Sequence, residues 1–146
     1  MTTWSGKWRL AVDKALNYLA LARKGGLAEL GEEPVGAITR AGKAALVIVA
    51  GDASDHTWRR AKSFVAGTNQ PCIRLKYTKD ELGLTVGRTS LAIGALTDAA
   101  LALAFAKALE SCDGEVLTAL EERVKRLKAR AKEAKAHQRN VRKGKK

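Results

Sequence analysis

Cysteine, proline and aromatic residues are scarce in this chain of 146 residues, and long apolar runs are absent. The 2 cysteines, Cys72 and Cys112, lie far apart, so we expect inert packing residues rather than a disulfide framework or a zinc motif. No run approaches the about 20 apolar residues that a bilayer-spanning helix needs, and the N-terminal residues lack an apolar signal core. These absences predict a soluble cytoplasmic protein without a membrane partner.

Acidic residues are also few in comparison with basic ones. The chain has 15 Asp and Glu against 27 Lys and Arg, which gives a net charge of +12 and a pI near 10.1. The electrostatic field of so positively charged a chain attracts phosphate, which predicts a polyanionic partner. Residues 121–146 hold 12 of the basic and 3 of the acidic residues, so this segment has a net charge of +9 and the rest of the chain only +3.

What the chain does contain is an alternation of helical and strand-like segments. Residues 44–50 (AALVIVA) form a short, β-branched apolar run, which is typical of a central strand covered on both faces. Shorter strands are expected at residues 27–30, 72–75 and 91–96, and helices at residues 9–23, 32–41, 58–65 and 98–110. Thr78 and Glu81 have the spacing of a capping box over one helical turn. This order predicts an α/β protein, with residues 1–112 forming one three-layer α/β/α sandwich around a small mixed sheet.

After Gly114 the pattern changes to that of one long basic helix. Its apolar residues recur every three or four positions in a heptad-like stripe: Leu117, Leu120, Val124, Leu127, Ala131 and Ala134. Beyond His137 the stripe ends, so residues 113–146 are expected to be a basic C-terminal helix followed by a disordered tail. This segment can serve as a nonspecific RNA arm, as a helix that docks on another protein, or as a solvated extension. We favour the RNA arm.

Four segments in this order, LALARKGGL, GEEPVGAITRAGKAALVIVAGDAS, KDELGLTVGRTS and LAIGALTD, resemble a known family over about residues 15–109. The family is the bacterial YlxQ-like branch of the ribosomal protein L-seven-Ae and L-thirty-e proteins. The resemblance implies an α/β/α sandwich that binds kink-turns, which are sharply bent RNA elements built on sheared G·A pairs. It implies no metal or cofactor.

The resemblance also places two parts of the chain against the RNA, the start of the second helix and the loop before the last strand. It implies Gly31 as the turn glycine that lets the backbone approach RNA, and Lys79 as a phosphate contact. Residues 86–90 match the loop that covers the flipped-out nucleotide. The RNA-binding residues implied in this way are Gly31, Glu32, Glu33, Lys79, Val86, Gly87, Arg88, Thr89 and Ser90.

The chain departs from the family at the positions that read bases. Family members with strict kink-turn specificity have Asn, Glu and Lys where this chain has Glu33, Pro34 and Ala37. A carboxylate at position 33 can accept a hydrogen bond from a guanine edge but lacks the amide donor of Asn. The protein is therefore expected either to read a variant motif or to bind RNA chiefly through charge.

Each implied contact has a plain alternative when the residues are taken alone. Arg88 can fork two donors to a phosphate or stack on a base, or it can be a solvated loop arginine. Glu32 and Glu33 sit where a helix dipole favours acids, and we assign Glu32 mainly to that role. A basic rim that offsets these acids is expected from three flanking residues, Lys24, Arg40 and Lys43.

Asp52 and His56 follow the predicted central strand, where an α/β enzyme places its chemistry. They could act as a base and its partner, or as metal ligands if a third ligand were near. We favour the reading in which Asp52 or Ser54 caps the next helix and His56 lies in its first turn, since no nucleophile or phosphate loop accompanies them. The three tryptophans, Trp4, Trp8 and Trp58, are too sparse for a base-stacking platform and are expected to fill the core or fix a terminus.

The sequence thus predicts a noncatalytic RNA-binding protein whose partner is structured RNA, such as ribosomal RNA with a kink-turn or similar bend. The alternative is a protein-interaction module that has no specific RNA target. It would dock a ribosomal or other protein on the stripe of the C-terminal helix.

Overall fold

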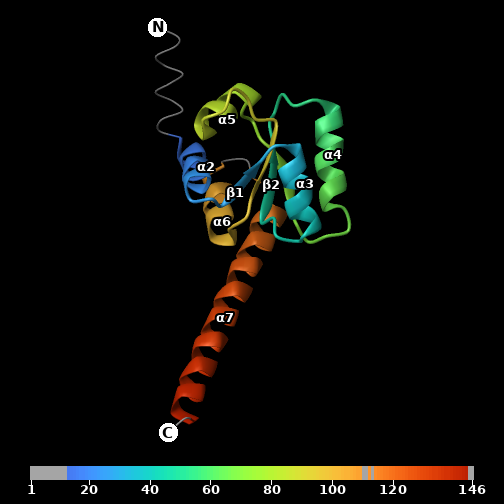
Figure 1. The fold of residues 1–146 in the computed structure, drawn as a ribbon. Helices are drawn as coiled ribbons and strands as arrows, with labels where there is room; N and C mark the ends of the chain where they lie inside the picture. Colours follow the sequence, from blue (N-terminus) through green and yellow to red (C-terminus); the bar gives the residue numbers. More distant parts are fainter. Residues whose placement is uncertain (1–12, 110–111, 113, 145–146) are drawn as a thin grey trace.

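A computed structural model describes residues 13–109, 112 and 114–144 of the chain. Figure 1 shows a sheet flanked by helices, with one long helix projecting from the body. The strands are β1 (Ala28–Leu30), β2 (Leu46–Val49), β3 (Cys72–Arg74) and β4 (Ile93–Leu96). The helices are α2 (Lys14–Lys24), α3 (Glu32–Arg40), α4 (Asp55–Val65), α5 (Lys79–Val86), α6 (Ala99–Ala108) and α7 (Gly114–Gly144). The predicted α/β class and C-terminal helix are confirmed.

The sheet is mixed and has the strand order β1-β4-β2-β3. β2 pairs in parallel with β3 and antiparallel with β4, and β1 pairs antiparallel with β4. Every residue of β2 and β4 is buried, because these interior strands are covered on both faces. The apolar run at residues 44–50 is therefore an interior strand, as predicted.

Two groups of helices cover the sheet. α2 packs on α5 and α6, and α3 packs on α4, so the sheet lies between the two groups (Figure 1). Leu16, Leu19 and Phe105 are buried on the side of the first group, and Val35 and Ala61 on the side of the second. Trp58 of α4 packs against the edge of the core, as expected, while Trp4 and Trp8 lie outside the described residues.

Side-chain caps start four of these helices where the sequence places a short polar residue. Asp13, Ser54, Thr78 and Asp98 each accept a hydrogen bond from a backbone N–H in the first turn. Thr78 and Glu81 form the predicted capping box, although the helix that follows is longer than the single turn expected and continues to Val86. These short polar residues therefore determine where the four helices begin.

α7 begins within the body and then leaves it. Leu120 is 1% exposed, and Val116, Leu117 and Val124 pack beside it on the core. Past this point the helix projects away from the sheet (Figure 1). α7 continues to Gly144, past His137, where the sequence led us to expect the helix to end. Residues 115–143 contain neither Gly nor Pro and are rich in Ala, Lys, Arg and Glu, so helix propensity continues after the apolar stripe has ended.

Among the described residues, no helix is both long enough and apolar enough to cross a membrane.

Candidate functional site

The two segments singled out from the sequence meet at one end of the sheet. Gly31 stands between β1 and α3 with φ 99° and ψ 161°, a conformation that an L side chain rarely adopts. Its N–H donates to the carbonyl of Ile93 at 3.0 Å, which ties the start of α3 to β4. A Cβ placed on Gly31 would lie 3.7 Å from Nη1 of Arg88. The start of α3 and the loop after α5 therefore form one continuous surface.

Residues 88–90 fold back over α5 because that helix carries a glycine at the point of contact. The N–H of Arg88 donates to the carbonyl of Gly83 at 2.7 Å, after Gly87 ends the helix in the left-handed conformation. A Cβ on Gly83 would lie 2.6 Å from the Cα of Ser90, which is closer than real Cβ atoms approach. Gly83 was not singled out from the sequence. Its position inside the α5 segment was the signal for a close backbone approach.

The loop presents four of its five predicted residues to solvent and one to the core. Gly87, Arg88, Thr89 and Ser90 are exposed. Val86 is 4% exposed and belongs to the hydrophobic core, so it supports the loop from beneath. The exposed guanidinium and the two hydroxyls are the groups here that can donate to an oxyanion.

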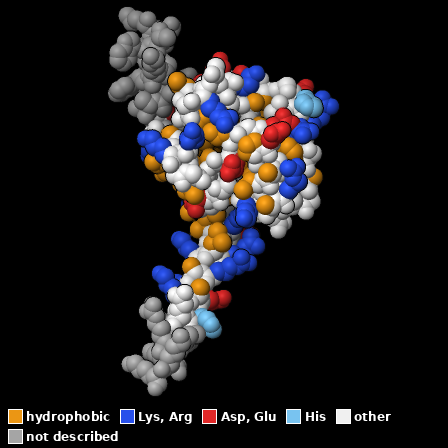
Figure 2. Space-filling view, viewed as in Figure 1, with side chains coloured by type: hydrophobic (Ala, Val, Ile, Leu, Met, Phe, Trp, Pro, Cys, Tyr) orange, Lys and Arg blue, Asp and Glu red, His pale blue; other side chains and the backbone are white. Residues whose placement is uncertain are grey.

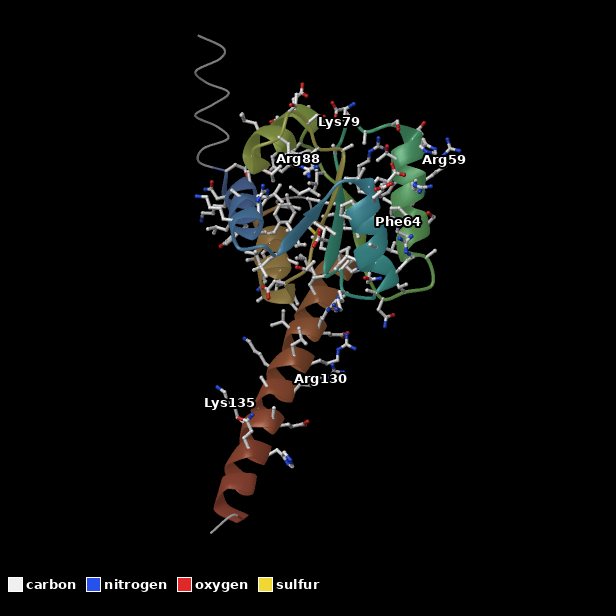
Figure 3. All side chains as sticks on the ribbon, viewed as in Figure 1. Arg59, Phe64, Lys79, Arg88, Arg130 and Lys135 are labelled. Carbon is white, nitrogen blue, oxygen red and sulfur yellow. The ribbon has the colours of Figure 1, made fainter. Side chains whose placement is uncertain are left out.

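Lys79 lies next to this loop, at the first position of α5. Its N–H donates to Oδ1 of Asp52 at 2.8 Å, and its carbonyl accepts from the N–H of Leu91 at 2.9 Å. Figure 3 shows Lys79 and Arg88 at the same end of the molecule. Ser54 caps α4, as expected, but Asp52 instead holds the start of α5, a helix distant from it in the sequence.

The two acids at the start of α3 have different surroundings. Glu32 forms an ion pair with Arg60, which comes from the neighbouring helix α4. Glu33 is exposed, and within the described part of the chain no side chain pairs with it. Arg60 was not singled out from the sequence, because only the packing of α4 against α3 brings it to this surface. Part of the negative charge at the start of α3 is thus neutralised.

The predicted basic rim is not at this surface. Arg40 is the last residue of α3 and Lys43 follows that helix, whereas Gly31 precedes its N-terminal end. Lys24 precedes β1, and Gly31 follows that strand. All three basic residues therefore lie at the far ends of the elements that begin or end at Gly31. Closeness in sequence was misleading because a helix and a strand each separate their ends in space.

Asp52 and His56, the possible catalytic groups, form no hydrogen bond with each other in the described part of the chain. The carboxylate of Asp52 is engaged with α5, and His56 is exposed. In residues 13–109, 112 and 114–144, no group of three or more His, Cys, Asp and Glu side chains could hold a metal ion. Burial raises the pKa of the Cys72 thiol to about 12, an effect that Lys62 only partly opposes, so this thiol is protonated at neutral pH.

Comparison with known proteins relates the chain to others by its fold. No model of a protein family matches the sequence, and no curated protein matches it. A protein of unknown function from Bacillus halodurans is similar in structure, with a TM-score of 0.63 and 24% identity over 68% of this chain and 99% of that one. The 15.5kD RNA binding protein of Giardia lamblia is also similar, with a TM-score of 0.53 and 19% identity over 76% of this chain and 90% of that one.

Proposed function

We propose that this chain is a noncatalytic protein that binds structured RNA, and that it holds a kink-turn or a similar bend, with ribosomal RNA as the target. The observation that carries the proposal is the position of the Arg88 guanidinium beside Gly31, where an added Cβ would lie 3.7 Å from Nη1 of Arg88. It joins into one exposed surface the two parts of the chain that the family resemblance assigns to RNA. The fold shared with an RNA binding protein of Giardia lamblia supports this choice.

The surface suits a phosphate backbone that turns sharply. Arg88 is exposed, and its planar guanidinium can donate two parallel hydrogen bonds to one phosphate. Lys79 adds a second positive charge from the start of α5. Gly31 has no side chain to hold a ribose or phosphate away from the start of α3, where the helix dipole favours an anion. These groups together form a clamp for a bent strand.

The same surface has few groups that distinguish one base from another. Glu33, Pro34 and Ala37 provide one carboxylate and no donor. The ion pair between Glu32 and Arg60 reduces the repulsion that an acid exerts on phosphate, but it also occupies both side chains. We therefore propose that the protein selects RNA mainly by the shape of the bend and by charge, and only weakly by sequence.

The direct test is binding to a kink-turn and to an unbent duplex of the same length at several salt concentrations. The wild-type protein is expected to prefer the bent RNA, and the preference is expected to persist as salt weakens both complexes. Arg88→Ala should weaken binding to the bent RNA about tenfold and to the duplex much less. Equal affinity for the two RNAs would contradict the proposal of bend recognition.

Arg23→Ala is the matched control for Arg88→Ala. Arg23 is an exposed arginine in the last turn of α2. It precedes β1, whereas Gly31 follows β1, so the two residues lie at opposite ends of that strand. Its removal lowers the net charge by the same amount without touching the proposed clamp. An equal loss of bent-RNA affinity in both variants would show that charge alone, and not the position of Arg88, matters.

The alternative function, a protein-interaction module, depends on the apolar stripe of α7. Half of that stripe already packs on the body, since Leu120 is buried and Val124 lies against the core. Leu127 remains 47% exposed, followed by two alanines at positions 131 and 134. Purified protein that carries no nucleic acid absorbing at 260 nm and that dimerises through α7 would favour this alternative.

A further inference from the structure

A groove of about 690 Å³ lies where α7 leaves the body, at the end of α3 that is remote from Gly31. Its walls are the C-terminal end of α3, the loop at residues 66–71 and one face of α7. Four arginines line it: Arg40, Arg123, Arg126 and Arg130. Glu122 is the one acidic residue among the residues that line it. Figure 2 shows Lys and Arg side chains gathered at this junction. We call this feature the arginine groove.

The arginines of α7 form a row along the groove. Arg123, Arg126 and Arg130 are spaced by three and four positions, so they share one face of the helix and extend over about 10 Å of its axis. Arg123 is anchored, since its Nη1 donates to the carbonyl of Ala44 at 2.7 Å. Lysines at positions 125, 128, 132 and 135 follow the other side of the apolar stripe. Figure 3 shows Arg130 and Lys135 on opposite sides of α7.

The wall opposite α7 is held in place by a buried glutamine. Gln70 is 7% exposed. Its Nε2 donates to the carbonyl of Thr39 at 3.0 Å, and its Oε1 accepts from the N–H of Ala44 at 2.9 Å. These bonds fix the loop at residues 66–71 to the end of α3. The groove is thus formed before any ligand binds, which lowers the entropy cost of binding.

Three arginines of the groove have no ion-pair partner among the residues that the structure describes. In the part of the chain that the structure describes, no carboxylate pairs with Arg40, Arg126 or Arg130. Several guanidinium groups held near one another attract an anion strongly. A row about 10 Å long suits a chain of phosphates better than a single small anion. Guanidinium groups also match the geometry of phosphate oxygens, which they bind with two parallel hydrogen bonds.

We propose that the arginine groove binds the phosphodiester backbone of an RNA stem that extends from the bent RNA. The identity of this polymer rests on the proposed function. We call the surface formed by Gly31, Lys79 and residues 88–90 the Arg88 surface. The groove contact is separate from it, because the groove and the Arg88 surface lie at opposite ends of α3. The protein would then hold one RNA at two places, a bend at one end of its body and a straight stem at the other.

The test uses the full chain and two RNA probes, one kink-turn with short stems and the same kink-turn with one stem long enough to pass the body. The double variant R126A/R130A is expected to bind the long RNA about tenfold more weakly than wild type and the short RNA equally well. The slope of log affinity against log salt for the long RNA should fall by about 2, since two phosphate contacts are lost. Both arginines are exposed, so circular dichroism is expected to show an unchanged fold.

The double variant K125A/K128A is the matched control, because it removes the same charge from the same part of α7 on the side away from the groove. It should reduce affinity for the long RNA clearly less. An equal reduction would overturn the proposal, as would unchanged RNA binding by R126A/R130A, the result expected if the groove takes an acidic protein segment instead. If the wild-type protein binds neither RNA, the proposed function is contradicted as well. If Arg88→Ala weakens binding to both RNAs while R126A/R130A has no effect, only the proposal about the groove is overturned.

Discussion

At the scale of single residues, two glycines make the candidate surface possible. Gly31 has a backbone conformation that other residues rarely adopt, and Gly83 allows the loop at residues 88–90 to lie directly on α5. Neither glycine contributes a functional group. Both glycines determine where the Arg88 guanidinium is held, although neither has a side chain of its own.

Gly83→Ala is expected to displace the loop and to destabilise the protein by about 1–3 kcal/mol, because the new Cβ meets backbone that cannot move aside cheaply. Urea unfolding followed by circular dichroism measures this change. The control is Gly114→Ala at the start of α7, where an added Cβ meets no atom within 4 Å. That variant should change stability by less than about 1 kcal/mol. Equal effects would contradict the packing of the loop on Gly83.

The thiol of Cys72 provides a second prediction at this scale. Burial raises its pKa to about 12 from the ordinary value of 9.0, so the thiolate is disfavoured in the folded protein. At pH 8 iodoacetamide should modify Cys72 at least about 100-fold more slowly in the folded than in the denatured protein. Peptide mass spectrometry gives the rate for this site. Similar rates in the two states would contradict the burial of this thiol.

The raised pKa of the Cys72 thiol also lowers the stability of the folded protein at high pH. Below pH 9 the thiol is protonated in both states and has no effect. As pH rises above about 9, the thiol of the unfolded chain ionises first, so this group favours unfolding and stability falls.

At the scale of elements, α7 has two different halves. The first half completes the body through Leu120 and its neighbours, whereas the second half makes few contacts and carries charge. The same heptad-like stripe passes through both. Periodicity in the sequence therefore identified the helix but could not say what the apolar face would contact.

Leu120→Ala should cost about 2–5 kcal/mol, because it leaves a cavity beneath α7. The matched variant is Leu127→Ala, two turns further along the same stripe, where the side chain is 47% exposed. This change should cost less than about 0.5 kcal/mol. Denaturant unfolding midpoints of the two variants measure these two costs. A large cost at position 127 would instead indicate that a second molecule covers the outer part of α7.

At the scale of the whole molecule, the positive charge is divided between two ends of the body. The Arg88 surface lies at the N-terminal end of α3 and in the loop after α5, and the arginine groove and the projecting part of α7 lie at the other end of the body. Residues 131–146 add 7 basic residues and 1 acidic residue beyond the groove. Under the proposed function, the Arg88 surface is expected to supply the preference for bent RNA over duplex, and the other end is expected to supply affinity for both.

Removal of residues 131–146 tests this division, because it retains the part of α7 that packs on the body. The truncated protein should unfold at nearly the same temperature as the full chain, since Leu120 and Val124 remain in place. It should bind bent RNA and duplex more weakly by the same factor, with a flatter salt dependence for both. Titrations at three or more salt concentrations measure the slopes. A loss confined to the bent RNA would contradict this division.

Local features of the sequence were sufficient to predict most of the fold. The apolar run at residues 44–50, the capping residues Ser54 and Thr78, and the helix after Gly114 all form the elements expected of them. Caps and buried strands are determined by residues close to one another in the chain, which is why they can be read directly.

The sequence by itself determined the charge and the order of helices and strands. Through a family resemblance, it also pointed to the two segments that contain Gly31 and Arg88. Only the tertiary structure decided that Asp52 holds α5, that Arg60 pairs with Glu32, and that Arg40 belongs to a groove beside α7. Each of these contacts joins residues from different elements. Their positions follow from how helices pack across a sheet, and periodicity along the chain carries no information about that packing.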